Sequence, residues 1–192
     1  MPTPKRPPLI DAPAYTLREA TRLTGISFGA LHAWSHGAPA TSRRRGTPPI
    51  IQLAGNHWSF TNLVEAHAFR ALRKTHQLQL VAIRKAVRFV EEQLKVKHPL
   101  ATVEFKTDGI HLFVDKFGKL INASQDGQTA MREVLEQYLR QVVYGRDGRA
   151  ARLYLDGERR LIVIDPAIRF GRPVVTGTSV PVEMIGERFD AG

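Results

Sequence analysis

The chain has 192 residues, no cysteine and a formal net charge of +10, and this composition excludes disulfides, thiolate metal sites and thiol catalysis. No apolar run approaches membrane-spanning length and the N-terminus lacks a signal-peptide core, so we expect a cytoplasmic protein. Residues 1–98 carry 15 Lys and Arg against 5 Asp and Glu, whereas residues 99–192 carry 13 of each, and this asymmetry favours DNA as a partner of the first half.

Residues 1–14 hold five prolines and few side chains that could pack. This composition predicts a flexible arm. Lys5 and Arg6 could add weak contacts to DNA phosphates.

Residues 15–36 have the pattern of two short helices joined by a glycine turn. Thr16 with Glu19 three residues later forms a predicted capping box, Gly25 ends the first helix, and Ser27 caps the second. A helix-turn-helix unit and an ordinary helical hairpin both fit this pattern. The residues expected to face inward are Leu17, Ala20, Leu23, Ile26, Leu31 and Trp34.

The string Tyr15-Thr16-Leu17…Ala20…Thr24-Gly25-Ile26-Ser27…Leu31…Trp34 resembles the start of a MerR-type winged helix-turn-helix. The resemblance implies that the second helix enters the major groove. His32 and Ala33 stand where that family usually has an arginine and an aromatic residue. His32 and His36 could also be metal ligands, but no third ligand is close in sequence, so we expect no metal. The DNA-contacting residues expected in this head are Thr16, Arg18, Ser27, Phe28, Gly29 and His32.

Residues 37–60 fit the wing of such a head. The stretch 37–49 is rich in Gly, Pro and Ser, and Arg43, Arg44 and Arg45 lie at its centre. Residues 50–53 and 57–60 alternate as two short strands around a Gly-Asn turn. A wing along the duplex would bring the three arginines to phosphates or into the minor groove, whereas the alternative is a solvated loop.

Residues 61–97 predict two helices that support the wing. Thr61 caps the first, and the second has apolar residues spaced 3-4-3-4, with Pro99 ending it. Residues 15–98 are therefore expected to be one winged helix-turn-helix DNA-binding domain. The apolar positions of the second helix are Leu80, Ile83, Val87, Val90 and Leu94.

Residues 99–160 predict a small α+β unit that serves as a spacer or in dimerisation. Strands are expected at 103–105, 110–114 and 120–121, a helix at 128–142, and a hairpin joining 152–155 to 161–164 across Asp156-Gly157. The neutral charge of this block argues against DNA contact.

Residues 161–192 predict a strand, a tight loop and a short helix over 182–191. The β-branched pair Val174-Val175 favours extended backbone, and Gly171 and Gly177 can adopt positive φ. The two glycines are one residue too far apart for a phosphate-binding loop and no lysine follows Gly177. A third glycine that would complete a dinucleotide fingerprint is also missing.

This segment resembles a domain-of-unknown-function family found in antitoxins of toxin–antitoxin operons. The resemblance rests on the string Asp165-Pro166…Arg169-Phe170-Gly171-Arg172-Pro173-Val174…Gly177-Thr178…Val180-Pro181-Val182. In that family a helical hairpin normally follows, so we expect the segment to be truncated or to lack the hairpin. The resemblance implies a PIN-type ribonuclease toxin as the partner of the C-terminal part. The residues expected to contact it are Arg169, Phe170 and Arg172.

Together these patterns predict an α+β protein: a DNA-binding head, a central α+β unit and an antitoxin-family segment. The leading hypothesis is a VapB-like antitoxin that neutralises its toxin, binds operator DNA as a homodimer and represses its own operon. The alternative is a stand-alone MerR-type regulator that senses a small molecule. A nucleic-acid-processing enzyme is a third hypothesis, but the scattered carboxylates and the absence of catalytic motifs predict no enzyme and no cofactor.

Overall fold

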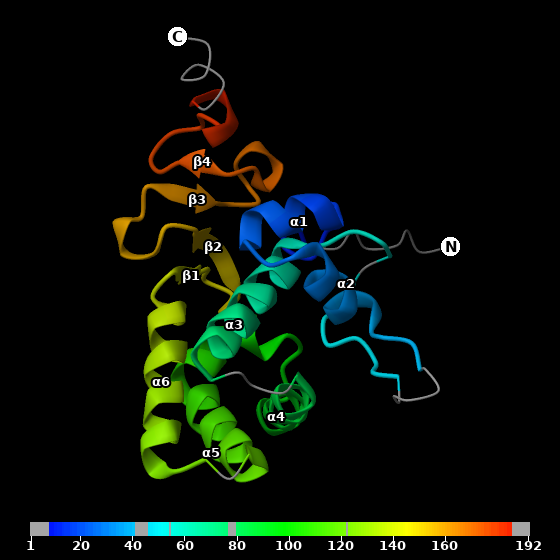
Figure 1. Ribbon diagram of the computed structural model, residues 1–192. Helices are drawn as coiled ribbons and strands as arrows, with labels where there is room; N and C mark the ends of the chain where they lie inside the picture. The colour runs from blue at the N-terminus through cyan, green and yellow to red at the C-terminus, as the bar shows by residue number, and fades with distance from the viewer. Residues whose placement is uncertain (1–7, 41–45, 54, 77–79, 122, 186–192) are drawn as a thin grey trace, which may run out of the picture.

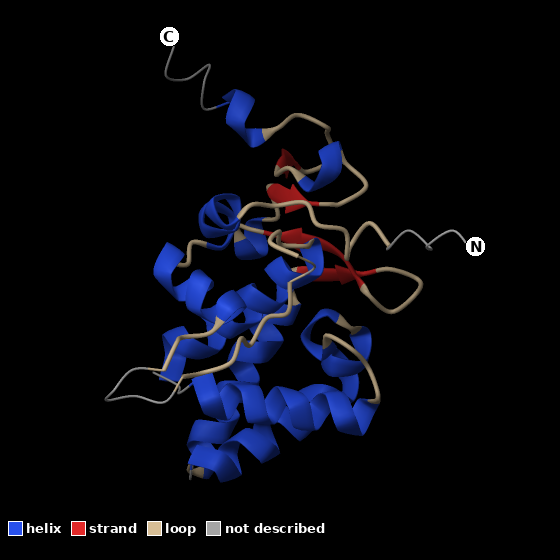
Figure 2. Cartoon of the chain, turned by 90° about the vertical axis from the view of Figure 1, so that its right-hand side faces the viewer, coloured by secondary structure: helices blue, strands red, loops and turns tan. Residues whose placement is uncertain are grey.

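The computed structural model describes residues 8–40, 46–53, 55–76, 80–121 and 123–185. Helices form most of the molecule, and a small sheet lies beside the start of the chain and below the C-terminal segment (Figures 1 and 2). The helices are α1 (Leu17–Thr24), α2 (Phe28–His36), α3 (Phe60–His76), α4 (Leu80–Leu94), α5 (Ile110–Ile121) and α6 (Gln125–Leu139). The strands are β1 (Val142–Tyr144), β2 (Ala150–Tyr154), β3 (Ile162–Ile164) and β4 (Val174–Val175).

The first two helices form as the sequence predicts. The backbone N–H of Glu19 donates to Thr16 Oγ1 at 3.2 Å, and the Thr16 N–H donates to Glu19 Oε2 at 2.7 Å, which completes the capping box. Gly25 ends α1 in the left-handed region with φ 64°, where a side chain would be strained. Ser27 caps α2 by accepting from the Ala30 N–H at 3.4 Å.

The two wing strands expected at 50–53 and 57–60 are wrong. Trp58 instead pairs with Tyr15 through backbone hydrogen bonds of 2.9 and 2.8 Å. A separate pair of backbone bonds, 2.9 and 2.8 Å, joins Ala38 to Thr47 and closes the loop that contains the three arginines. The predicted Gly55-Asn56 turn is present, with Gly55 at φ 74°, but the residues that follow it pair with Tyr15 at Trp58 and then enter α3.

The predicted cap of α3 is also wrong. The helix begins at Phe60, and the Asn62 N–H donates to Ser59 Oγ at 3.1 Å while the Ser59 N–H donates to Asn62 Oδ1 at 3.0 Å. Ser59 is therefore the capping residue. Thr61 Oγ1 instead donates to Ile10 O at 3.1 Å and to Asp11 Oδ1 at 2.8 Å.

The largest correction concerns residues 103–121, where three strands were expected. Phe105–Gly109 is a π-helical turn that runs directly into α5. In α5 the residues Ile110, Phe113, Val114 and Phe117 are buried at helical spacing, and the rings of Phe113 and Phe117 stack at 5.5 Å. The helix expected at 128–142 is α6, three residues earlier at both ends. Helix α4 ends at Leu94, well before Pro99, which opens a short 3-10 turn.

The sheet is antiparallel with the order β1-β2-β3-β4. The predicted hairpin is confirmed, since Leu153 of β2 pairs with Ile164 of β3. Val163 of β3 pairs in turn with Val174 of β4, which places the last described strand at the edge of the sheet. The strand–loop arrangement expected after residue 161 is therefore present, and the expected final helix begins at Val182 while residues 186–191 lie outside the described part.

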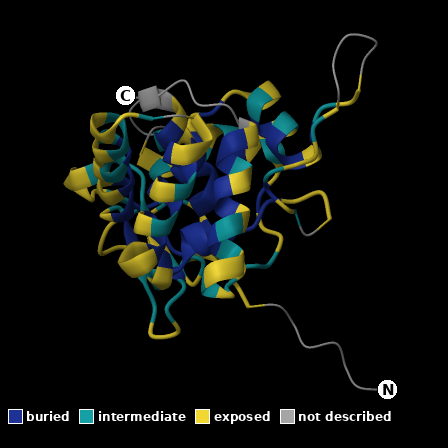
Figure 3. Cartoon of the chain, turned by 90° about the horizontal axis from the view of Figure 1, so that it is seen from below, coloured by how far each residue is buried: buried dark blue, intermediate teal, exposed yellow. Residues whose placement is uncertain are grey.

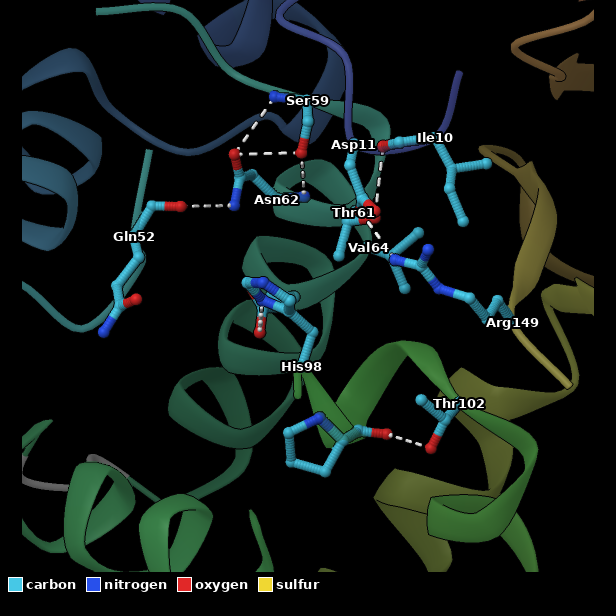
Figure 4. Close-up of polar contacts among 12 residues, drawn as sticks. Ile10, Asp11, Gln52, Ser59, Thr61, Asn62, Val64, His98, Thr102 and Arg149 are labelled. Atoms are coloured by element: carbon cyan, nitrogen blue, oxygen red, sulfur yellow. Dashed lines mark hydrogen bonds and ion pairs between the residues drawn. The ribbon is translucent and has the colours of Figure 1, made fainter. Parts of the chain in front are cut away.

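The hydrophobic core is continuous across the expected boundary at 98/99. Buried side chains from Tyr15 to Ile164 form one cluster, and the burial pattern runs through the interior of the helical body (Figure 3). A polar network also ties the start of the chain to the rest (Figure 4): Arg149 Nη2 donates to Asp11 Oδ1 at 2.6 Å, and the Thr61 N–H donates to Ile10 O at 3.0 Å. Residues 8–14 are thus held against the body, although a flexible arm was expected there. In the described ranges, no helix combines the length and apolar character needed to cross a bilayer.

Candidate nucleic-acid and partner interfaces

The residues predicted to contact DNA in the head are all exposed. Thr16 and Arg18 lie at the start of α1, and Ser27, Phe28, Gly29 and His32 lie at the start and outer face of α2. An exposed helix start with free backbone N–H groups is a suitable contact for a phosphate. The structure therefore places these predicted residues on the two helices of one unit (Figure 1).

The outer face of α2 is aromatic rather than cationic. Phe28, which is 53% exposed, stacks on His32 at 6.3 Å between ring centroids, and His32 stacks on His36 at 4.5 Å. Such a face can contact thymine methyl groups and offer imidazole hydrogen bonds to base edges. None of the described residues contributes to a group of three potential metal ligands, so the histidine pair does not extend to a metal site within that part.

The inner face of α2 fixes this surface to the core. Leu31 and Trp34 are fully buried, and the Trp34 ring meets Phe69 of α3 edge-on at 6.0 Å. The guanidinium of Arg73 lies 5.6 Å from the Trp34 ring centroid. Rotation of α2 is therefore opposed by one large indole held between α3 side chains.

The predicted arginines Arg43, Arg44 and Arg45 lie outside the described residues. Ala38 and Thr47, on the two sides of this segment, pair with each other, and Ala38 directly follows Gly37, the C-cap of α2. Their role in DNA contact stays a prediction.

The C-terminal loop forms a turn with an unusual backbone. Arg169, Phe170 and Gly171 have φ values of 49°, 56° and 78°, so three successive residues occupy the left-handed region. Each non-glycine residue there costs roughly 1–2 kcal/mol. Phe170 at the centre of the turn is 91% exposed. A strained backbone that presents a phenyl ring to solvent is costly for stability, so this turn is a candidate binding surface.

Contacts on both sides hold this turn in place. Tyr15 Oη donates to Gly171 O at 2.9 Å in a buried hydrogen bond that joins the turn to the residue preceding α1. Arg169 Nε donates to Ser179 O at 3.2 Å. Hydrogen bonds from the Thr16 backbone and side chain lower the pKa of Glu19, whereas its burial acts in the opposite direction. The charge of Arg172 also lowers the pKa of Glu19, so this arginine of the C-terminal loop interacts electrostatically with α1.

The strand before the turn is anchored by a partly buried ion pair. Asp165, only 7% exposed, accepts from Arg152 Nε at 2.8 Å and from the Ala167 N–H at 2.8 Å. Asp165 therefore has a structural role, because its carboxylate accepts from a backbone N–H two residues later as well as from Arg152.

Exposed apolar side chains gather in the same C-terminal segment. The sequence predicted Phe170 as a toxin contact, but neither this gathering nor the contact with Tyr15 was predicted. The density of Val, Met and Ile after Gly177 was the available signal. The large apolar residues exposed between 161 and 185 are Leu161, Phe170, Val180, Met184 and Ile185.

Comparison with known proteins finds relatives of this segment and of the whole chain. Residues 162–192 match the family described as "Protein of unknown function (DUF433)". The chain is also similar to "Putative antitoxin VapB45" of Mycobacterium tuberculosis, with 28% identity over 90% of this chain and 80% of that protein. The fold is similar to the crystal structure of Rv2018 from Mycobacterium tuberculosis, with a TM-score of 0.68 and 22% identity over 95% of this chain and 89% of that one. The chain is therefore a distant homologue of a protein named as an antitoxin, and its α+β fold is shared with a solved structure.

Proposed function

We propose that this chain is a non-enzymatic antitoxin that binds and neutralises a ribonuclease toxin of the PIN type. The observation that carries the proposal is Phe170, which is 91% exposed on a turn of three left-handed residues inside the segment matched to DUF433. The named relative supports the same role.

The chemistry of the turn suits a ribonuclease active site. Arg169 and Arg172 are exposed on either side of Phe170. Guanidinium groups form paired hydrogen bonds with carboxylates, and metal-dependent ribonucleases hold their metal with clustered carboxylates. Phe170 would fill an apolar pocket at the centre of the contact while the two arginines pair with acidic groups at its edge.

The head supports a second part of the proposal, operator binding that represses the operon. The exposed faces of α1 and α2 and the positive charge of the first half suit a duplex, and a two-fold operator would require a homodimer. If Arg43, Arg44 and Arg45 each neutralise a phosphate, replacing all three with Gln lowers the salt slope of operator binding by about 2.7.

Reciprocal variants test the two surfaces. The chain is co-expressed with the ribonuclease encoded beside it, and inhibition of RNA cleavage is titrated, while operator affinity is measured by fluorescence anisotropy. Phe170→Ser should weaken inhibition at least about tenfold and leave operator affinity unchanged, and Phe28→Ser should do the reverse. Full inhibition by Phe170→Ser would refute the assignment of the turn.

A second candidate, a regulator that senses a small molecule, rests on one cavity. A space of about 500 Å³ lies between α3, α4 and residues 49–52, with Glu65, Arg84 and Glu91 among its walls. Operator binding that responds to a metabolite and needs no protein partner would favour this function over the antitoxin.

A further inference from the structure

A groove whose walls include none of the residues proposed for DNA or toxin contact contains several polar side chains without a hydrogen-bond partner among the described residues. Two adjoining cavities of about 310 and 570 Å³ share Gln137, Gln141 and Gly157 as walls, so they form one continuous groove between α6 and the turn joining β2 to β3. Its size is in the range of sites for small organic ligands.

One end of the groove contains a buried imidazole. His67 of α3 is 9% exposed, and its Nδ1 has no hydrogen-bond partner among the described residues. Burial, and secondarily the charge of Arg70, lowers the pKa of His67 to about 4, so the ring is neutral at pH 7. Because Nδ1 itself is closed off from solvent, the His67 ring serves as a neutral wall at this end of the groove. The hydroxyl of the neighbouring Tyr138 donates to Val64 O at 2.6 Å.

The middle of the groove offers two free amides. Gln137 lies in the last turn of α6 and Gln141 lies two residues beyond its end, and within the described ranges neither side chain has a hydrogen-bond partner. A side-chain amide presents a donor and an acceptor together, which matches the edge of a nucleobase. Val134 and Leu155 provide apolar wall beside them.

The other end of the groove is cationic. Arg140 and Arg160 line it, Arg160 Nη2 donates to Arg140 O at 3.1 Å, and the Arg160 guanidinium lies 5.1 Å from the Tyr154 ring centroid. No ion pair with either arginine occurs in the described part of the chain, although Glu158 also lines this end. The negative end of the α6 dipole lies close by and opposes an anion, but it amounts to about half a charge against two guanidinium groups.

We propose that this groove binds a nucleoside monophosphate. The phosphate pairs with Arg140 and Arg160, and the base lies along the apolar wall with its edge against Gln137 and Gln141. Guanidinium groups suit the phosphate because their planar fork can donate two parallel hydrogen bonds.

The test is calorimetric titration of the whole chain with AMP, GMP, CMP and UMP, and with inorganic phosphate. The buffer contains about 150 mM salt, which screens interactions between exposed charges. At least one nucleotide should bind saturably with one-to-one stoichiometry and shift the ring ¹⁵N resonances of His67. Arg140→Gln and Arg160→Gln should each weaken that binding about tenfold, because each removes a charge-assisted hydrogen bond.

Matched controls separate the groove from the general positive charge. Arg159→Gln removes an exposed arginine that is adjacent to Arg160 but lies outside the groove walls. Glu136→Ala changes an exposed residue of α6 that is adjacent to Gln137 and also lies outside the groove walls. Neither should change the affinity.

Three results would overturn the proposal. These are no saturable binding of any of the four nucleotides, equal affinity for inorganic phosphate, and an equal loss of affinity in Arg159→Gln and Arg160→Gln. The titration uses neither DNA nor a toxin, so its outcome is independent of the proposed antitoxin function.

Discussion

The contact between Gly171 and Tyr15 allows a quantitative test of how the C-terminal turn is held. A Cβ added at Gly171 would lie 2.1 Å from Tyr15 Oη and 3.1 Å from Tyr15 Cζ, and φ at this position is +78°. Gly171→Ala therefore combines about 1 kcal/mol of left-handed strain with displacement of the turn. That displacement breaks the buried hydrogen bond from Tyr15, for about 1–3 kcal/mol more. We expect a total loss of about 2–4 kcal/mol in the free energy of unfolding.

Two variants isolate the cause. Gly177 has φ +79° but no heavy atom within 4 Å of an added Cβ, so Gly177→Ala should lose only the backbone part, about 1 kcal/mol. Tyr15→Phe removes the hydroxyl and should cost about 1–2 kcal/mol alone, while reducing the further cost of Gly171→Ala. Guanidinium unfolding of the two single variants, the double variant and the Gly177 control gives these values. Equal losses at the two glycines, or a strictly additive double variant, would refute the explanation.

Three other predictions follow from local contacts. Thr16→Ala removes the N-cap of α1 and should lower stability by about 1 kcal/mol, or about 2–4 °C in Tm by thermal denaturation. The hydrogen bond to Glu65 raises the pKa of His98 above 6.5 in spite of burial. The stability that this gives is present below pH 6.5 and is lost as the pH rises through the raised pKa of His98. The free energy of unfolding measured from pH 5 to 9 should therefore fall with rising pH in the parent, and His98→Gln should lack this fall. Phe170→Ser should stay within about 0.5 kcal/mol of the parent in the same unfolding assay, because the ring is exposed, and a larger loss would mean that the ring packs internally.

The elements that could be predicted from the sequence are those whose signals are local. The capping box at Thr16, the left-handed Gly25 and the cap at Ser27 depend on residues within a few positions of each other, and all three are confirmed. The hairpin joining β2 to β3 follows from two short apolar runs around Asp156-Gly157, and its pairing is confirmed by Leu153 and Ile164.

The block around α5 could not be predicted in this way, because the spacing of its apolar residues fits a strand as well as a helix. Ile110 and Val114 fall on one face of a strand as well as on one face of a helix, and aromatic and β-branched residues favour strands. The Phe117-Gly118 pair reads as a turn, yet Gly118 lies inside α5 where an added Cβ would be 2.8 Å from the Gln128 side chain. The glycine leaves room for the Gln128 side chain of α6 to lie against α5, and such packing between separate helices leaves no local signal.

The same limit applies to the candidate sites. Phe170 was found because the family resemblance includes it, whereas the hydrogen bond that holds its turn spans 156 residues of sequence. The groove residues His67, Gln141 and Arg160 come from three separate elements and show no spacing pattern that could have joined them.

The position of β3 and β4 in the sheet limits how the DUF433 segment can be exchanged between proteins. The matched residues supply the outer half of a sheet whose inner half, β1 and β2, precedes the match. Cutting before Ile162 would strip β3 of its partner strand and separate Asp165 from Arg152. A chimaera designed to change the partner should therefore either move the chain from Val142 onward or graft only the turn 169–172, because a boundary at the edge of the family match would split one folding unit in two.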